Sequence, residues 1–225
     1  MKLLKKAVLA IVVVSMALTS LFAMTGCGGS ELKKMFNDLG TNFTFYGGSG
    51  ADEIELDVTE EGFHLHTPGY LHPDPNDGRI RYGDMYYKQL ESGDYVRYKR
   101  VYRNQISTNE FVTDTITASE YNSIVKNLLQ YLLMPIANYE KSYTATDIPE
   151  APTAKVYEGE RAVYNVTVSG NAYTYTYTDI LISVYEGKVA AVYYSLEISV
   201  GGQVTSSGDY EFIRDNADIT FPVMN

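Results

Sequence analysis

Apolar and polar residues alternate along most of the chain, with the period of two that is typical of half-buried β-strands. At residues 53–58, for example, Ile54, Leu56 and Val58 alternate with acidic residues. The Gly62 turn that follows predicts a hairpin with residues 63–66. The same pattern predicts strands at 79–82, 84–90, 94–103, 111–116, 161–168, 172–184, 188–200, 203–213 and 217–221.

Two segments have helical spacing instead. Residues 31–39 carry apolar side chains at i, i+3, i+4 and i+7, with Ser30 as a possible cap and Gly40 as a stop. A longer helix is predicted at 117–134, where Thr117 and Glu120 form a capping box and Pro135 ends the pattern. Its apolar stripe comprises Tyr121, Ile124, Val125, Leu128, Leu129, Leu132 and Leu133.

The predicted strand at 172–184 changes its apolar phase. Tyr173, Tyr175 and Tyr177 stand at odd positions, whereas the apolar residues after Asp179 stand at even ones. A strand cannot move its buried side chains to the other face without a bulge. We therefore expect a bulge here, in a strongly bent antiparallel sheet.

The chain has 225 residues with 21 Tyr, 8 Phe and no Trp. Tyrosine favours half-buried strand surfaces. We predict an α+β fold that is mainly β, formed by one domain at residues 31–222, with a short N-terminal helix and a central amphipathic helix. The Thr- and Pro-containing residues 143–155 are expected to form a surface connector.

The first thirty residues have a different character. Three lysines precede an uncharged apolar run at residues 7–24, which is typical of a secretory signal peptide. Cys27 is the chain's single cysteine, so no disulfide can form within the chain. An uncleaved transmembrane anchor is the alternative.

Residues 24–27, Met-Thr-Gly-Cys, resemble the lipobox of bacterial prolipoproteins, although that family prefers Leu where Met24 stands. The resemblance implies cleavage after residue 26, a diacylglycerol on Cys27, and a short tether at 27–30. It therefore implies an exported protein held at the extracytoplasmic face of the cell membrane. Two acyl chains would hold such a domain stably on a bilayer.

The formal net charge is −10, and loss of the three lysines in residues 1–26 changes it to −13. An acidic domain is repelled by nucleic acids and by anionic lipid headgroups. We therefore expect neither to be a general partner.

The order of elements and the closing segment YEFIRDNADITFP at 210–222 resemble the LolA-like and LppX-like lipoprotein superfamily. The resemblance implies a half-open barrel, plugged by helices, that holds acyl chains on its concave face. The ligand site would then lie between sheet and helix, lined by Leu128, Leu129, Leu132, Leu133, Tyr173, Tyr175 and Tyr177. A solid core is the alternative, because both arrangements use the same residue types.

His64 and His66 fall on one face of a predicted strand, with His72 and Asp74 in the next loop. Two imidazoles on one face can begin a transition-metal site. Alternation with Phe63 and Leu65 explains the pattern more simply, so we predict no metal site. The Asp-rich residues 74–78 are expected to form a turn, because Met85 stands where a calcium loop needs an acid.

Seven basic residues lie between Arg79 and Arg103. They could meet an anionic partner, but we expect them to pair across strands with acids such as Glu53, Glu55 and Asp57.

The sequence has no GxSxG, HExxH or phosphate-binding glycine motif. We therefore predict a non-enzymatic envelope lipoprotein without a cofactor that binds a lipid or other hydrophobic molecule. The alternative is a protein- or glycan-binding module that uses exposed tyrosines and basic residues.

Overall fold

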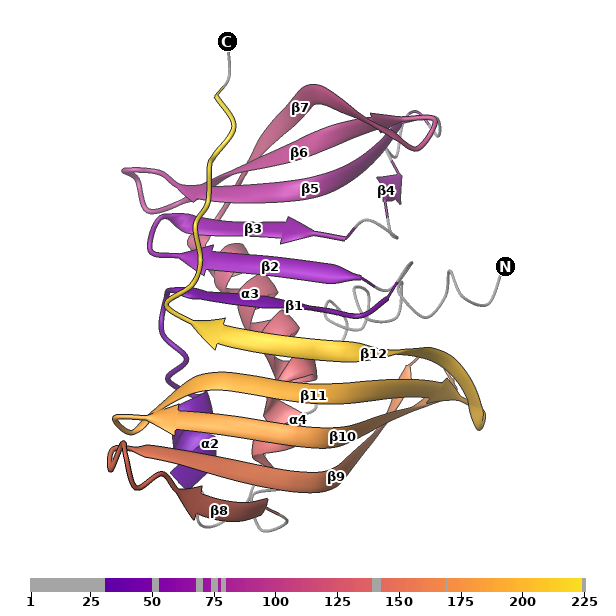
Figure 1. The fold of residues 1–225 in the computed structure, drawn as a ribbon. Helices are drawn as coiled ribbons and strands as arrows, with labels where there is room; N and C mark the ends of the chain where they lie inside the picture. The colour runs from indigo at the N-terminus through magenta and orange to yellow at the C-terminus, as the bar shows by residue number, and fades with distance from the viewer. Residues whose placement is uncertain are drawn as a thin grey trace.

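The computed structural model describes residues 31–49, 53–67, 71–73, 77, 80–138, 143–168 and 170–223 (Figure 1). Cys27, the expected signal peptide and the expected tether lie outside these residues. Among the described residues, no helix combines the length and the apolar character needed to span a membrane.

The fold is mainly β and consists of one large, open antiparallel sheet. Its strand order is β7-β6-β5-β3-β2-β1-β12-β11-β10-β9-β8, with the short β4 paired to β5. The strands are β1 (Phe43–Gly47), β2 (Ile54–Thr59), β3 (Gly62–His66), β4 (His72–Pro73), β5 (Ile80–Gln89), β6 (Tyr95–Arg103), β7 (Ile106–Ile116), β8 (Tyr143–Asp147), β9 (Ala154–Val168), β10 (Asn171–Tyr185), β11 (Lys188–Val200) and β12 (Gln203–Arg214).

Two meanders form this sheet, and the pairing of β1 with β12 joins them. Phe43 lies opposite Arg214, and Phe45 lies opposite Phe212 on one side and Leu56 of β2 on the other. The Phe43 and Phe212 ring centroids are 5.1 Å apart. Because Phe43, Phe45 and Phe212 are almost completely buried, the seam between the meanders is also the centre of the core.

The described helices are α2 (Glu31–Phe36), α3 (Ala118–Leu132) and α4 (Met134–Ala137). Figure 1 shows α3 behind the sheet, where it links the edge strand β7 to the opposite edge. The predicted capping box is confirmed: the Glu120 amide donates to Thr117 Oγ1, and the Thr117 amide donates to the Glu120 carboxylate. The helix ends before Pro135, as the sequence predicts.

The change of phase in β10 is confirmed. Its register against β11 shifts between Thr178 and Leu181, and Asp179 has a φ of 53°. Because of this bulge, the odd-numbered side chains before Asp179 and the even-numbered side chains after it both face the core. The buried side chains are Tyr173, Tyr175 and Tyr177 before it, and Ile180, Ile182 and Val184 after it.

Several boundaries differ from the predictions. The predicted strands at 79–82 and 84–90 form the single strand β5, which continues through a bulge at Asp84. The predicted connector at 143–155 contains β8, because its backbone pairs with the long strand β9. Residues 217–221 form no strand. They belong to an extended segment that Figure 1 shows crossing the sheet face opposite α3, where Lys88 Nζ lies 5.3 Å from the Phe221 ring centroid.

Candidate functional site

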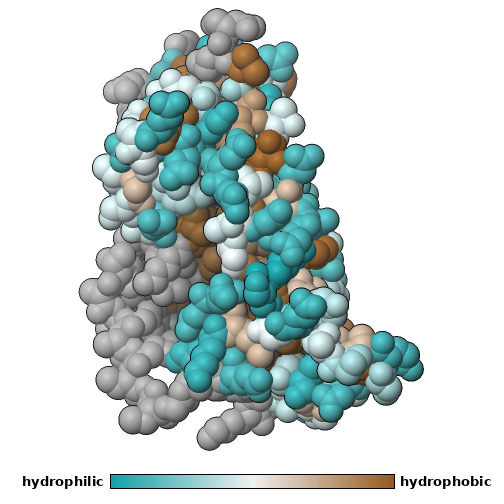
Figure 2. Space-filling view, turned by 90° about the vertical axis from the view of Figure 1, so that its left-hand side faces the viewer, coloured by the Kyte–Doolittle hydropathy of each residue, from teal (hydrophilic) through white to brown (hydrophobic). Residues whose placement is uncertain are grey.

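An open cavity of about 700 Å³ lies between the sheet, α3 and the segment that follows α2. Figure 2 views the molecule from the side where β1 begins and β2 ends, and it shows apolar surface recessed among hydrophilic side chains. The aliphatic and phenylalanine side chains that line the cavity are Phe36, Leu39, Phe43, Val58, Val125 and Leu129.

The residues of α3 that line the cavity follow from helical geometry. Tyr121, Val125 and Leu129 are spaced four residues apart and therefore share one face of the helix. Opposite them, Phe43 of β1 and Val58 of β2 are directly paired and both are buried. The cavity thus lies between one apolar face of the helix and neighbouring side chains of the sheet.

Stacked aromatic rings form one wall of this cavity. Tyr121 of α3 stacks on Tyr95 of β6 with a centroid separation of 3.6 Å and an interplanar angle of 7°. The Tyr121 ring also lies 5.2 Å from the ring centroid of Phe63. Burial raises the pKa of the Tyr121 hydroxyl, and the neighbouring Tyr95 raises it further. Tyrosine hydroxyls are uncharged at neutral pH in any case, so this wall carries no charge.

The rim of the cavity is polar and acidic. Asn37, Asp38, Thr41, Thr59, Glu60 and Asn122 contribute to it. The segment after α2 is held by Arg214, whose Nη2 donates to the Asp38 carbonyl at 2.8 Å and whose Nε donates to the Val189 carbonyl at 2.6 Å. One wall of the cavity is therefore anchored to the strand pair β11–β12.

The predicted ligand-binding residues are only partly brought together. Leu129 lines the cavity, whereas Leu128 and Leu133 are buried and are not among its lining residues. The side chain of Leu132 lies outside the described part of the structure. The tyrosine ladder of β10 faces the core away from this cavity: Tyr173, Tyr175 and Tyr177 are 6%, 3% and 0% exposed.

The basic residues between Arg79 and Arg103 are largely paired across strands, but with acids other than those expected. Arg97 Nε donates to Asp114 Oδ1 at 2.7 Å, and Lys99 Nζ lies 3.1 Å from Asp114 Oδ2. Arg103 likewise pairs with an acid of β7, Glu110. None of these three ion pairs uses the expected partners Glu53, Glu55 and Asp57, because β6 pairs with β5 and β7 rather than with β2.

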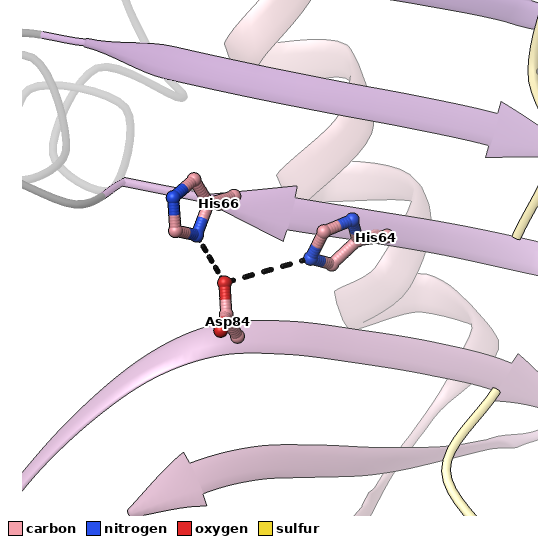
Figure 3. A group of neighbouring side chains, drawn as sticks. All are labelled: His64, His66 and Asp84. Carbon is pink, nitrogen blue, oxygen red and sulfur yellow. Dashed lines mark hydrogen bonds and ion pairs between the residues drawn. The ribbon is translucent and has the colours of Figure 1, made fainter. Parts of the chain in front are cut away.

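A group of polar side chains on β3 and β5 lies on the sheet face opposite the cavity. His64 and His66 alternate with the buried Phe63 and Leu65, and both imidazoles point toward Asp84 (Figure 3). The sequence gives a signal for the histidine pair, but the expected neighbours were His72 and Asp74. Asp74 and the His72 side chain lie outside the described residues.

His64, His66 and Asp84 influence one another's protonation. Burial lowers the pKa of His64, but contacts with Asp57 and Asp84 outweigh it, so the net shift is upward. The hydrogen bond to Asp84 likewise raises the pKa of His66. Burial of Asp84 opposes its ionisation, yet the two imidazoles hold its pKa well below the usual value. An anionic carboxylate between the two rings is the stable form.

Sequence reasoning missed most of the cavity. Phe43 and Val58 contribute because β1 and β2 pair beside α3, and Leu39 contributes because the chain turns at Gly40, where φ is 79°. The helix stripe gave the correct face of α3, but the sequence contains no signal for which strands lie beneath it.

No protein-family model and no curated protein matches the chain.

Proposed function

We propose that this chain is a non-enzymatic lipoprotein of the cell envelope that binds a hydrophobic molecule in the cavity beneath α3. The single observation that carries the proposal is the cavity itself. Its volume of about 700 Å³ lies within the range of roughly 300–1,000 Å³ that is common for small-molecule sites. Its aromatic and aliphatic lining suits an acyl chain or a similar apolar group.

The acidic rim of the cavity restricts the charge that a ligand's polar head can carry. Asp38 and Glu60 stand among its polar residues, and none of the described residues that line the cavity is a lysine or an arginine. A free fatty-acid carboxylate would be repelled by this rim, whereas an uncharged or cationic amphiphile would not. We therefore infer that the ligand has an apolar body and an uncharged or positively charged head.

The resemblance to LolA-like lipoproteins supports the same proposal at the level of fold. In that superfamily a half-barrel holds acyl chains between sheet and helix, and here the cavity lies between a large antiparallel sheet and α3. We propose that the open sheet acts as such a half-barrel. Anchoring through a diacylated Cys27 would place it at the extracytoplasmic face of the cell membrane.

The alternative, a protein- or glycan-binding surface of exposed tyrosines and basic residues, is weakened at the residues first named for it, whereas Tyr46, Tyr185 and Tyr193 are exposed. The three β10 tyrosines are buried, and Arg97 and Lys99 are engaged by Asp114. These groups would first have to leave their partners before they could contact a protein or a glycan.

The binding proposal can be tested with N-phenyl-1-naphthylamine, an uncharged dye whose fluorescence rises in apolar sites. The purified protein should bind it, and Val125→Trp should weaken binding roughly tenfold or more, because the indole would occupy the cavity. Ser123→Trp is the matched control, since residue 123 is on the same helix but exposed. Equal dye affinity in the two variants would refute the cavity as the binding site.

The anchoring proposal needs a separate measurement. Intact mass spectrometry of protein extracted from host membranes should show loss of residues 1–26 and the added mass of a diacylglycerol. A Cys27→Ser variant should lack both changes, so it should keep residues 1–26 and carry no diacylglycerol. An unmodified full-length mass for the wild-type protein would contradict the anchoring proposal while leaving the dye result unaffected.

A further inference from the structure

His64, His66 and Asp84 place three potential metal-ligand atoms within 4.8 Å of one another. Figure 3 shows both imidazoles on β3 directed at one oxygen of the Asp84 carboxylate on β5. His66 Nδ1 contacts Asp84 Oδ1 directly, and His64 Nε2 lies 3.7 Å from the same oxygen. Two imidazole nitrogens therefore approach the same carboxylate oxygen.

The backbone of β5 is distorted where it supplies this carboxylate. His64 lies opposite Tyr86 and Leu65 lies opposite Met85, so Asp84 comes next to His66. The β5–β6 register shifts between Gly83 and Met85, and Asp84 itself has a φ of 45°. Bulges and left-handed non-glycine residues cost free energy and are enriched at functional sites. The distortion is a reason, independent of side-chain chemistry, to look for a ligand here.

The second oxygen of Asp84 is held on the far side by two other groups. Arg100 Nε lies 2.8 Å from Asp84 Oδ2, and the Tyr102 hydroxyl donates to Oδ2 at 3.2 Å. The Tyr102 hydrogen bond and the Arg100 ion pair, whose Nε is not in hydrogen-bonding geometry, hold Oδ2 and leave Oδ1 facing the histidines. Metal-binding carboxylates are commonly oriented in this way by hydrogen bonds to their other oxygen.

His64 is oriented in a similar manner. Its ring stacks on Tyr86 with a centroid distance of 4.2 Å and an interplanar angle of 15°. Its Nδ1 faces Asp57 Oδ2 at 3.7 Å, so a carboxylate stands at the ring nitrogen that points away from Asp84. Carboxylates in this position are typical partners of metal-binding histidines. His64 Nε2 is buried and makes no hydrogen bond to the described residues.

The local charge also favours a cation. Glu55 and Asp57 of β2 lie opposite His66 and His64 in the sheet, and Asp84 adds a third carboxylate. Arg100 pairs with Asp84 and offsets one of these charges. With neutral imidazoles, the three acids therefore leave an excess of negative charge around the point where the ligand atoms meet.

We propose that His64 Nε2, His66 Nδ1 and Asp84 Oδ1 bind a divalent transition-metal ion of the Zn²⁺ type, with water at the remaining coordination positions. Two nitrogen donors disfavour Mg²⁺ and Ca²⁺, which prefer oxygen ligands. The ion would replace the direct contact between His66 Nδ1 and Asp84 Oδ1, and it would fasten β3 to β5 across the bulge. This site is separate from the cavity, because its side chains lie on the other face of the sheet.

Calorimetric titration tests this site. Purified protein is stripped with EDTA, dialysed free of the chelator and titrated with Zn²⁺, and a parallel titration uses Mg²⁺. We expect one Zn²⁺ per chain, no measurable heat from Mg²⁺, and a higher thermal midpoint in the presence of Zn²⁺. Co²⁺ should give visible absorption bands of a low-coordinate site. Absence of saturable Zn²⁺ binding by the folded protein would overturn the proposal.

Variants identify the ligands. Asp84→Gly removes a ligand, and because glycine suits the positive φ at this position, the protein should remain folded. Its Zn²⁺ affinity should fall roughly 100-fold or more, because substitution of residues that merely hydrogen-bond to metal ligands already costs about 10–100-fold. His66→Gln should have the same effect. His72→Gln is the matched control, because it removes the only other histidine of the chain. Unchanged affinity in Asp84→Gly, or an equal loss in His72→Gln, would contradict the assignment.

Discussion

Burial at the seam between the two meanders should contribute strongly to stability, and Phe45→Ala tests this directly. Phe45 is fully buried, and its ring stacks near Tyr210 with centroids 5.9 Å apart. Truncation of a buried phenylalanine to alanine costs roughly 3–5 kcal/mol. For a domain of this size, each kcal/mol lowers the thermal midpoint by about 2–4 °C. We therefore expect a decrease of roughly 6–20 °C, measured by circular dichroism or calorimetry.

Tyr46→Ala is the matched control for this experiment. Tyr46 is the next residue on β1, but it points to the opposite face, is 41% exposed and hydrogen-bonds to Glu211 at the surface. Its removal should cost no more than about 0.5–1 kcal/mol. Equal decreases for the two variants would show that burial at the seam does not control stability. Dye binding below the unfolding transition should survive Phe45→Ala, because Phe45 does not line the cavity.

Two further predictions concern local interactions. Thr117→Ala should destabilise the protein by about 1 kcal/mol in urea unfolding, because the Glu120 amide loses its acceptor at the start of α3. Thr117→Ser keeps a hydroxyl acceptor and should be nearly neutral. An equal loss of stability in both variants would argue against the cap. The hydrogen bond from Arg97 holds the pKa of Asp114 below its usual value, so its stabilisation is present above about pH 4 and is lost as the pH falls through the lowered pKa. The difference in unfolding free energy between wild type and Asp114→Asn should therefore shrink from pH 6 to pH 2, and a difference independent of pH would contradict this assignment.

The parts of the fold that the sequence predicted correctly are local ones. The capping box depends on residues three apart, and the phase change in β10 can be read from one run of 13 residues around Asp179. β1 was missed, and one of its two partners, β12, lies at the other end of the chain, so the sequence around β1 does not reveal that pairing. β8 was missed for a similar reason: its polar side chains resemble a loop, and its backbone pairs at the edge of the sheet.

The difference between local and long-range signals also applies to the cavity and to the cluster of His64, His66 and Asp84. Alternation placed His64 and His66 on one face, but the carboxylate that joins them comes from Asp84, whose position depends on a bulge that composition does not reveal. The cavity is also nonlocal. A helical stripe predicts which face of α3 is apolar, but whether that face closes on the sheet depends on the packing of Leu39 and Phe43 from another segment.

The pairing of β1 with β12 has a consequence for biosynthesis. β1 leaves the ribosome long before β12, so the hydrogen-bonding edge of β1 that faces β12 stays without its native partner until nearly the whole chain has been made. Such an edge can pair with another chain, and contacts between distant segments form slowly. The nascent protein therefore has an aggregation-prone interval that closes only when its last strand arrives.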